Sequence, residues 1–121
     1  MLDTPPTPET YDCPFCAIVA GRAPGDVVHE WHDALAIVPL APVTEGHLLV
    51  IPKVHVADVG HDPYISAATM RRAAELAAEQ WCNVITSRGS VATQSVFHLH
   101  IHVIPRRKGD GVTLPWSEKG A

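Results

Sequence analysis

Three histidines stand at alternate positions near the C-terminal end of the chain, and their residue type is the one best suited to chemistry at neutral pH. They are His98, His100 and His102, and apolar residues lie between and beside them. A period of two with aromatic and β-branched residues predicts a strand from Gln94 to Ile104. Because residues two apart on a strand share a face, we expect three imidazoles on one face and apolar side chains on the other.

Imidazole can act as a nucleophile, a proton donor or a metal ligand, because its unperturbed pKa is roughly 6.5. Three interpretations of the histidine row follow from this chemistry. Alternate histidines can chelate one metal ion. One imidazole can attack a substrate while its neighbours orient groups or stabilise charge. The row can also be a structural set of hydrogen-bonded histidines in the core.

A second pair with potential chemistry lies near the N-terminus, where two residues separate Cys13 from Cys16. This spacing lets two thiolates reach a single zinc ion. Redox-active pairs have the same spacing, but they are expected in a thioredoxin-like βαβ context, which the preceding segment does not supply. Zinc with two further ligands, or two unpaired cysteines beside a helix, are the remaining interpretations.

The composition is that of one small globular domain. The chain has 121 residues, of which 46% are hydrophobic, and its formal net charge is −4. A negative chain without a basic stripe is not expected to bind nucleic acid, and the apolar runs are too short to span a membrane. Three cysteines are too few for a disulfide framework, and no signal-peptide pattern opens the chain. We therefore expect a cytoplasmic protein.

The elements that must position these residues follow from hydrophobic periodicity and turn signals. Residues 1–10 are proline-rich and predict a flexible leader, and residues 11–121 predict a single domain. The expected helices span residues 13–21 and 62–80. The expected strands, besides the histidine strand, span residues 27–31, 34–40, 47–51 and 81–86. This order favours an α+β domain with helices packed on an antiparallel sheet.

Two segments of the chain resemble the histidine-triad (HIT) superfamily, and in particular its zinc-containing bacterial members. One is the triad with its lead Gln94-Ser95-Val96-Phe97, and the other is the run Gly46-His47-Leu48-Leu49-Val50-Ile51-Pro52-Lys53. The resemblance implies an antiparallel sheet with one long and one short helix, usually in a homodimer. It also implies an enzyme that hydrolyses or transfers nucleotides.

The resemblance assigns roles to the histidines of the reaction centre. His100 is expected to attack the α-phosphorus of a phosphoramidate or dinucleoside polyphosphate, giving a covalent nucleotidyl-histidine that water then hydrolyses. His102 is expected to stabilise negative charge on the phosphate, and His47 to orient its partners. A purine nucleoside monophosphate derivative is the expected substrate. The residues expected to line the nucleotide and phosphate pocket are Ser95, Gln94, Thr93, Ser87 and Leu40.

The resemblance also implies a zinc site. Zinc-containing relatives bind the ion with residues that correspond to Cys13, Cys16, His55 and His98. Four protein ligands leave no open position on zinc, so this zinc is expected to be structural.

Three positions depart from the family pattern around the nucleotide. Pro39 stands where a ribose-binding acidic residue is usual, Ser87 stands where close relatives have asparagine, and Thr93 stands where glycine is common. Pro39 and Ser87 favour one alternative function, a nucleotide-binding or partner-binding module with little catalysis.

Overall fold

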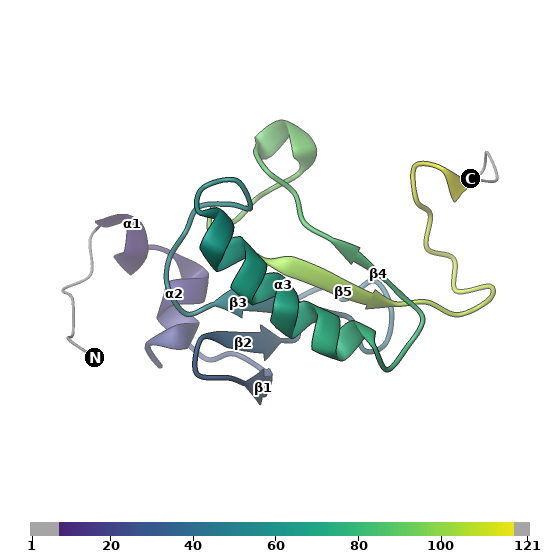
Figure 1. Cartoon of the computed structure of the whole chain (residues 1–121), viewed down its shortest axis with the longest axis horizontal. Helices are drawn as coiled ribbons and strands as arrows, with labels where there is room; N and C mark the ends of the chain where they lie inside the picture. Colours follow the sequence, from purple (N-terminus) through teal and green to yellow (C-terminus); the bar gives the residue numbers. More distant parts are fainter. Residues whose placement is uncertain (1–7, 118–121) are drawn as a thin grey trace.

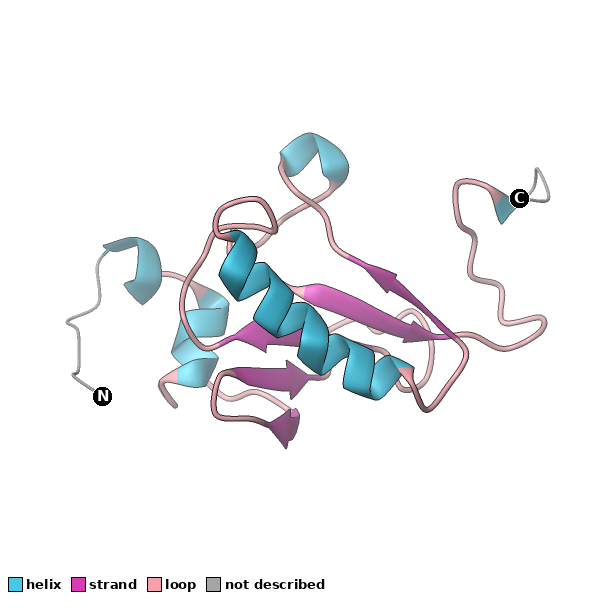
Figure 2. Cartoon of the chain, viewed as in Figure 1, coloured by secondary structure: helices cyan, strands magenta, loops and turns pink. Residues whose placement is uncertain are grey.

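Five antiparallel strands form one sheet, and the computed structural model describes it within residues 8–117 (Figures 1 and 2). The strands are β1 (Val27–Glu30), β2 (Ala34–Ile37), β3 (Leu48–Pro52), β4 (Cys82–Ile85) and β5 (Ile101–Pro105). Their order in the sheet is β1-β2-β3-β5-β4. The helices are α1 (Pro8–Tyr11), α2 (Pro14–Val19) and α3 (Pro63–Ala77), with a 3₁₀ turn η1 (Ser90–Ala92). The predicted α+β class, with one long and one short helix on an antiparallel sheet, is confirmed.

The expected leader is described only in part. Residues 1–7 lie outside the described residues, and residues 8–10 belong to α1. Within residues 8–117, none of the helices has both the length and the apolar character needed to cross a bilayer.

The long helix α3 crosses one face of the sheet, over β3 and β5 (Figure 1). Its start was predicted from Asp62-Pro63, and Asp62 Oδ1 accepts hydrogen bonds from the amides of Tyr64 and Ile65, at 3.0 and 3.4 Å. Small residues on both sides let helix and sheet approach closely. The buried core on this face consists of Ala34, Ala36, Val50, Val56, Ala73, Leu76, Leu99, Ile101 and Val103.

The short helix α2 covers the other face of the sheet, so the protein has two apolar layers. Phe15 of α2 is buried against side chains of β2 and β3. That second cluster consists of Cys13, Phe15, Leu35, Ile37, Leu49 and Ile51. The alternation of β2 and β3 residues between the two clusters is the period of two expected for strands buried on both faces.

The histidine segment departs from its prediction, because β5 begins only at Ile101 and contains one of the three histidines. Pro52 ends β3 and has no amide hydrogen with which to continue the ladder. The Leu99 amide instead donates to the carbonyl of Val56 at 2.8 Å. On the other side, the Thr86 hydroxyl replaces a ladder bond by donating to the His100 carbonyl at 2.8 Å.

The predicted division of side chains between two faces is nevertheless correct. Leu99, Ile101 and Val103 lie in the core under α3. The rings of His98 and His100 lie against Phe15 of α2, with ring centroids 5.8 and 5.2 Å away. The other predicted helices and strands differ from the structure only at their ends; β2, for example, stops at Ile37, before Pro39. The short elements α1 and η1 were not predicted.

Candidate active site and metal centre

The hydrogen bond of His100 determines which of its ring nitrogens can act as a nucleophile. Its Nδ1 lies 2.8 Å from the main-chain carbonyl oxygen of His98. A carbonyl oxygen only accepts, so Nδ1 must carry the hydrogen and donate. In neutral imidazole the other nitrogen then has the free lone pair. His100 therefore presents Nε2 as a nucleophile, and its side chain lines a cavity.

A hydrogen-bond relay assigns the opposite arrangement to His102. The Val43 amide donates to Nδ1 of His47 at 3.1 Å, so the proton of His47 resides on Nε2. This Nε2 lies 2.9 Å from Nδ1 of His102 and donates to it. His102 consequently carries its own proton on Nε2. The site thus combines a nucleophilic nitrogen on His100 with an N–H donor on His102, and their ring centroids are 5.3 Å apart.

Burial favours the neutral form of His47 and His102. Desolvation, together with smaller contributions from the nearby imidazoles of His100 and His47, lowers the pKa of His102 to about 4. Burial likewise lowers the pKa of His47, which is 4% exposed. Neutral rings are the condition for the donor and acceptor assignment above, so the relay is intact at physiological pH.

A cavity of about 840 Å³ opens beside the two catalytic candidates. Most of its wall is apolar and comes from α2, the loop that follows α2, and the end of β2. Its polar lining residues include His100, His102, Ser95 and the carboxylate residue Asp26. A cavity with apolar walls and a few convergent polar groups suits a ligand with a flat apolar part and a charged end.

The residues predicted for the nucleotide pocket fall into two groups. Ser95 and Leu40 line the cavity, and Leu40 is fully exposed at its rim. Thr93, Gln94 and Ser87 are not among the lining residues. Thr93 has a left-handed backbone with φ of 75°, which explains why glycine suits this position.

Sequence reasoning missed the part of the cavity wall that comes from the N-terminal region. Phe15 and Ile18 line the cavity, and so does Asp26 of the loop between α2 and β1. The helical spacing of Phe15 and Ile18 indicated a shared apolar face, but it does not distinguish a core-facing helix from a cavity wall. Asp26 shows no sequence signal, because a single aspartate in a loop is ordinary.

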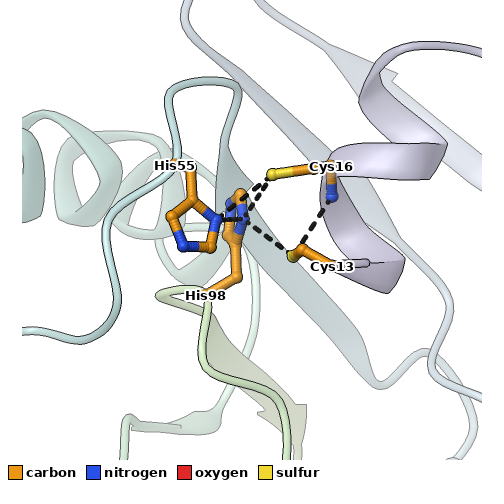
Figure 3. A group of neighbouring side chains, drawn as sticks. All are labelled: Cys13, Cys16, His55 and His98. Carbon is orange, nitrogen blue, oxygen red and sulfur yellow. Dashed lines mark hydrogen bonds between the residues drawn. The ribbon is translucent and has the colours of Figure 1, made fainter. Parts of the chain in front are cut away.

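Four predicted metal ligands converge on one point (Figure 3). Their ligand atoms, Sγ of Cys13 and Cys16 and Nδ1 of His55 and His98, all lie within 4.8 Å of one another. The sulfur–nitrogen and nitrogen–nitrogen contacts measure 3.2 to 3.5 Å. Tetrahedral zinc, with Zn–N near 2.0 Å and Zn–S near 2.3 Å, requires ligand separations of about 3.3 to 3.8 Å. The residues therefore fit zinc closely.

Local structure explains why these ligands meet. Cys13 is the N-cap of α2 and Cys16 lies in its first turn, so both thiols point to the same side. His55 follows β3, and His98 precedes β5, its neighbour in the sheet. Nε2 of His98 donates to the Pro52 carbonyl at 2.8 Å, which leaves its Nδ1 lone pair directed at the cluster. Burial lowers the pKa of His98 to about 4, so this ligand is neutral.

Comparison with known proteins agrees with this architecture. The model of the HIT domain matches residues 20–109. An uncharacterised HIT-like protein of Mycobacterium tuberculosis is 38% identical, over 84% of this chain and 76% of its own. The adenosine 5'-monophosphoramidase of Saccharomyces cerevisiae is 33% identical, over 90% of this chain and 73% of its own.

A solved structure adds evidence on the metal. The crystal structure of a zinc-bound histidine-triad family protein from Mycobacterium smegmatis is 38% identical in sequence. It superposes with a TM-score of 0.76 and covers 87% of this chain and 82% of that one. The matched domain spans most of the sequence and the fold is shared, so this chain belongs to the HIT family.

Proposed function

We propose that this protein is a nucleotidyl hydrolase or transferase that uses His100 as its nucleophile. The observation that supports this most directly is the bond from His100 Nδ1 to the His98 carbonyl, which leaves Nε2 free at the cavity. The name of the yeast relative, a monophosphoramidase, supports a nucleotide hydrolase in general terms. The proposed substrate is a purine nucleoside monophosphate derivative, either a phosphoramidate or a dinucleoside polyphosphate.

The reaction proceeds in two displacements at the α-phosphorus. Nε2 of His100 gives its lone pair to phosphorus, and the bond to the leaving group breaks with its electron pair. His102 donates a hydrogen bond from Nε2 to the phosphoryl group or to the leaving atom, where negative charge develops. Water then attacks phosphorus and breaks the P–N bond, and the proton that the water releases balances the proton that the leaving group takes up. The nucleoside monophosphate leaves, and the Nε2 lone pair of His100 is restored.

The cavity holds the nucleoside in this proposal. The base and sugar lie along the apolar wall that includes Phe15, and Leu40 covers the rim. Ser95 lines the same cavity as His100 and His102 and contacts the phosphate. Thr93 and Ser87 belong to the same loop as Ser95. In this proposal they reach the phosphate through the backbone of that loop or after a modest movement on binding.

The metal is proposed to be a structural zinc held by Cys13, Cys16, His55 and His98. The ion would cross-link α2, the loop after β3 and the segment before β5. With four protein ligands it would have no open coordination position for catalysis. Its support is the tetrahedral fit described above and the zinc-bound relative from M. smegmatis.

A screen of nucleotide substrates on the wild type and His100→Ala tests the activity. We expect turnover of adenosine 5'-phosphoramidate or a dinucleoside polyphosphate by the wild type, and its loss in His100→Ala. Intact mass spectrometry of a slowed His102 variant should detect a nucleotidyl adduct. His61→Ala serves as the control, because His61 is an exposed residue outside the cavity. Full turnover by His100→Ala would refute the mechanism.

The alternative is a nucleotide-binding or partner-binding module with little catalysis. Pro39 favours it, because this residue lines the cavity without a polar side-chain atom for the sugar. Tight binding of AMP by calorimetry, with no turnover across the substrate panel, would support this alternative. We also propose a cytoplasmic homodimer from the family resemblance, and light scattering at the monomer mass would contradict the dimer.

A further inference from the structure

Gln94 is a buried polar residue whose side chain bonds to three backbone groups, two in its own loop and one in a separate loop. Only 4% of its surface is exposed. Its Oε1 accepts from the Gly89 amide at 2.8 Å, and its Nε2 donates to the carbonyls of Ala57 and Val96, at 2.7 and 3.1 Å. Both Nε2 hydrogens are therefore used within the protein, so Gln94 is suited to positioning backbone rather than to binding phosphate.

The pieces that Gln94 joins belong to the two candidate sites. We call residues 86–96 the phosphate loop, because it ends at the cavity residues Ser95 and Val96. We call residues 53–60 the metal loop, because it contains His55. Ala57, which accepts from Gln94, is two residues from His55. One side chain thus connects the loop that presents a metal ligand with the loop that approaches the reaction centre.

Two further bonds tie the metal loop to the same stretch of chain. The Leu99 amide donates to the Val56 carbonyl at 2.8 Å, next to the ligand His98. Arg88 of the phosphate loop bonds Asp58 at 3.2 Å, but the Arg88 side chain is 68% exposed, so this ion pair is weak. Gln94 is therefore the buried connection between the phosphate loop itself and the metal loop.

The phosphate loop needs such support because its backbone is strained. Thr93 is β-branched and adopts a positive φ of 75°, a conformation that non-glycine residues rarely accept. Gln94 follows it and closes the loop on Gly89 twice, through its side chain and through its amide, which donates to the Gly89 carbonyl at 3.0 Å. Loss of the Gln94 side chain removes one closure and the tie to Ala57 together.

We propose that Gln94 is a positioning residue that couples metal binding at His55 to the geometry of the phosphate loop. An ordered metal loop holds the Ala57 carbonyl in place, Gln94 fixes the phosphate loop against it, and Ser95 is presented to the phosphate. The inference rests on the proposed function, since it requires nucleotide phosphate at Ser95. Coupling of this kind is reciprocal, so bound nucleotide must also tighten metal binding by the same factor.

Calorimetry and metal competition test the coupling. In the zinc-loaded wild type, AMP should bind at least about fivefold more tightly than after chelation, the lower end of measured couplings between sites. Saturating AMP should increase zinc affinity by the same factor, measured with a competing chromophoric chelator. In Gln94→Leu both effects should fall below about twofold, and AMP binding to the zinc-loaded protein should weaken.

Two further variants make the result specific. Gln94→Glu keeps an acceptor for Gly89 but replaces the donor to Ala57 with a carboxylate oxygen, so it should lose the coupling. Gln80→Leu is the matched control, because the Gln80 side chain donates to the Leu76 carbonyl, at the end of α3 and outside the cavity. It should behave as the wild type does.

The outcomes separate this inference from the proposed function. Wild-type protein that binds AMP equally with and without zinc overturns the coupling and leaves the nucleotide function intact. A coupling factor unchanged in both Gln94 variants overturns the role of Gln94. A zinc-loaded wild type that binds no AMP overturns both proposals.

Discussion

His47 offers the sharpest test of the relay that sets the chemistry of the site. Replacement by leucine keeps an apolar side chain in a position that is 4% exposed, but it removes the Nε2–H that donates to His102. Nδ1 of His102 can then take its own proton, which moves the lone pair to Nε2, the nitrogen that faces the phosphate. The N–H donor of His102 is replaced by a repulsive acceptor.

The magnitude follows from the loss of that bond. A buried acceptor left without its donor costs about 1–3 kcal/mol. If this cost falls on the transition state, where His102 must donate, kcat decreases by about 5- to 160-fold at 1.36 kcal/mol per decade. His47 does not line the cavity, so the Kd for AMP should stay within about twofold.

The assay measures kcat on the substrate found in the screen, together with the Kd for AMP by calorimetry. His47→Gln places an amide N–H near the position of Nε2 and should recover part of the lost kcat. His61→Leu is the exposed control. Wild-type kcat in His47→Leu would refute the relay, and so would equal losses in the leucine and glutamine variants with unchanged thermal stability.

Three other predictions follow from the same geometry. The pKa of His102 in the folded protein is about 4, below its ordinary 6.5. The unfolded chain therefore binds more protons than the folded protein between pH 4 and pH 6.5. Thermal melts should show full stability above pH 6.5 and decreasing stability toward pH 4. A Tm that stays constant over this range would contradict the buried neutral ring. Thr93→Gly relieves a strained φ and should stabilise the fold by about 1 kcal/mol, which corresponds to a rise of about 4 °C in Tm. A lower Tm would show that the threonine side chain is needed. Metal analysis should find one zinc per chain in the wild type and in His102→Ala but not in Cys13→Ser, and zinc retained in Cys13→Ser would refute the ligand set.

The fold could be predicted because its elements depend on local patterns, and the metal cluster could be predicted because the resemblance implied its four ligands. Hydrophobic alternation predicted the strands, the Asp62-Pro63 pair predicted the start of α3, and residue spacing together with resemblance predicted the four ligands. The start of β5 was missed because it depends on where the neighbouring strand ends. Pro52 stops the ladder, and no periodicity within the histidine segment encodes that fact.

The hydrogen-bond roles of the site were also beyond sequence reasoning. The main-chain carbonyl of His98 determines which ring nitrogen of His100 is free. Every residue has such a carbonyl, so the sequence does not indicate which one accepts from the ring. Gln94 was grouped with the phosphate ligands because the family resemblance implies that the backbone of residues 93–95 lines the phosphate pocket. Its burial and its bonds to Gly89 and Ala57 become visible only when the loops are placed in space.

His98 shows how the metal centre and the reaction centre share one residue without sharing chemistry. Its ring is held by Pro52 and by the metal cluster, whereas its main-chain carbonyl fixes the tautomer of His100. Because the carbonyl belongs to the backbone, His98→Ala removes a metal ligand but retains the acceptor for His100. We therefore expect any loss of activity in His98→Ala to arise from displacement of this segment, since the acceptor for His100 is retained. The segment that carries the three histidines thus connects the proposed metal site to the proposed nucleophile.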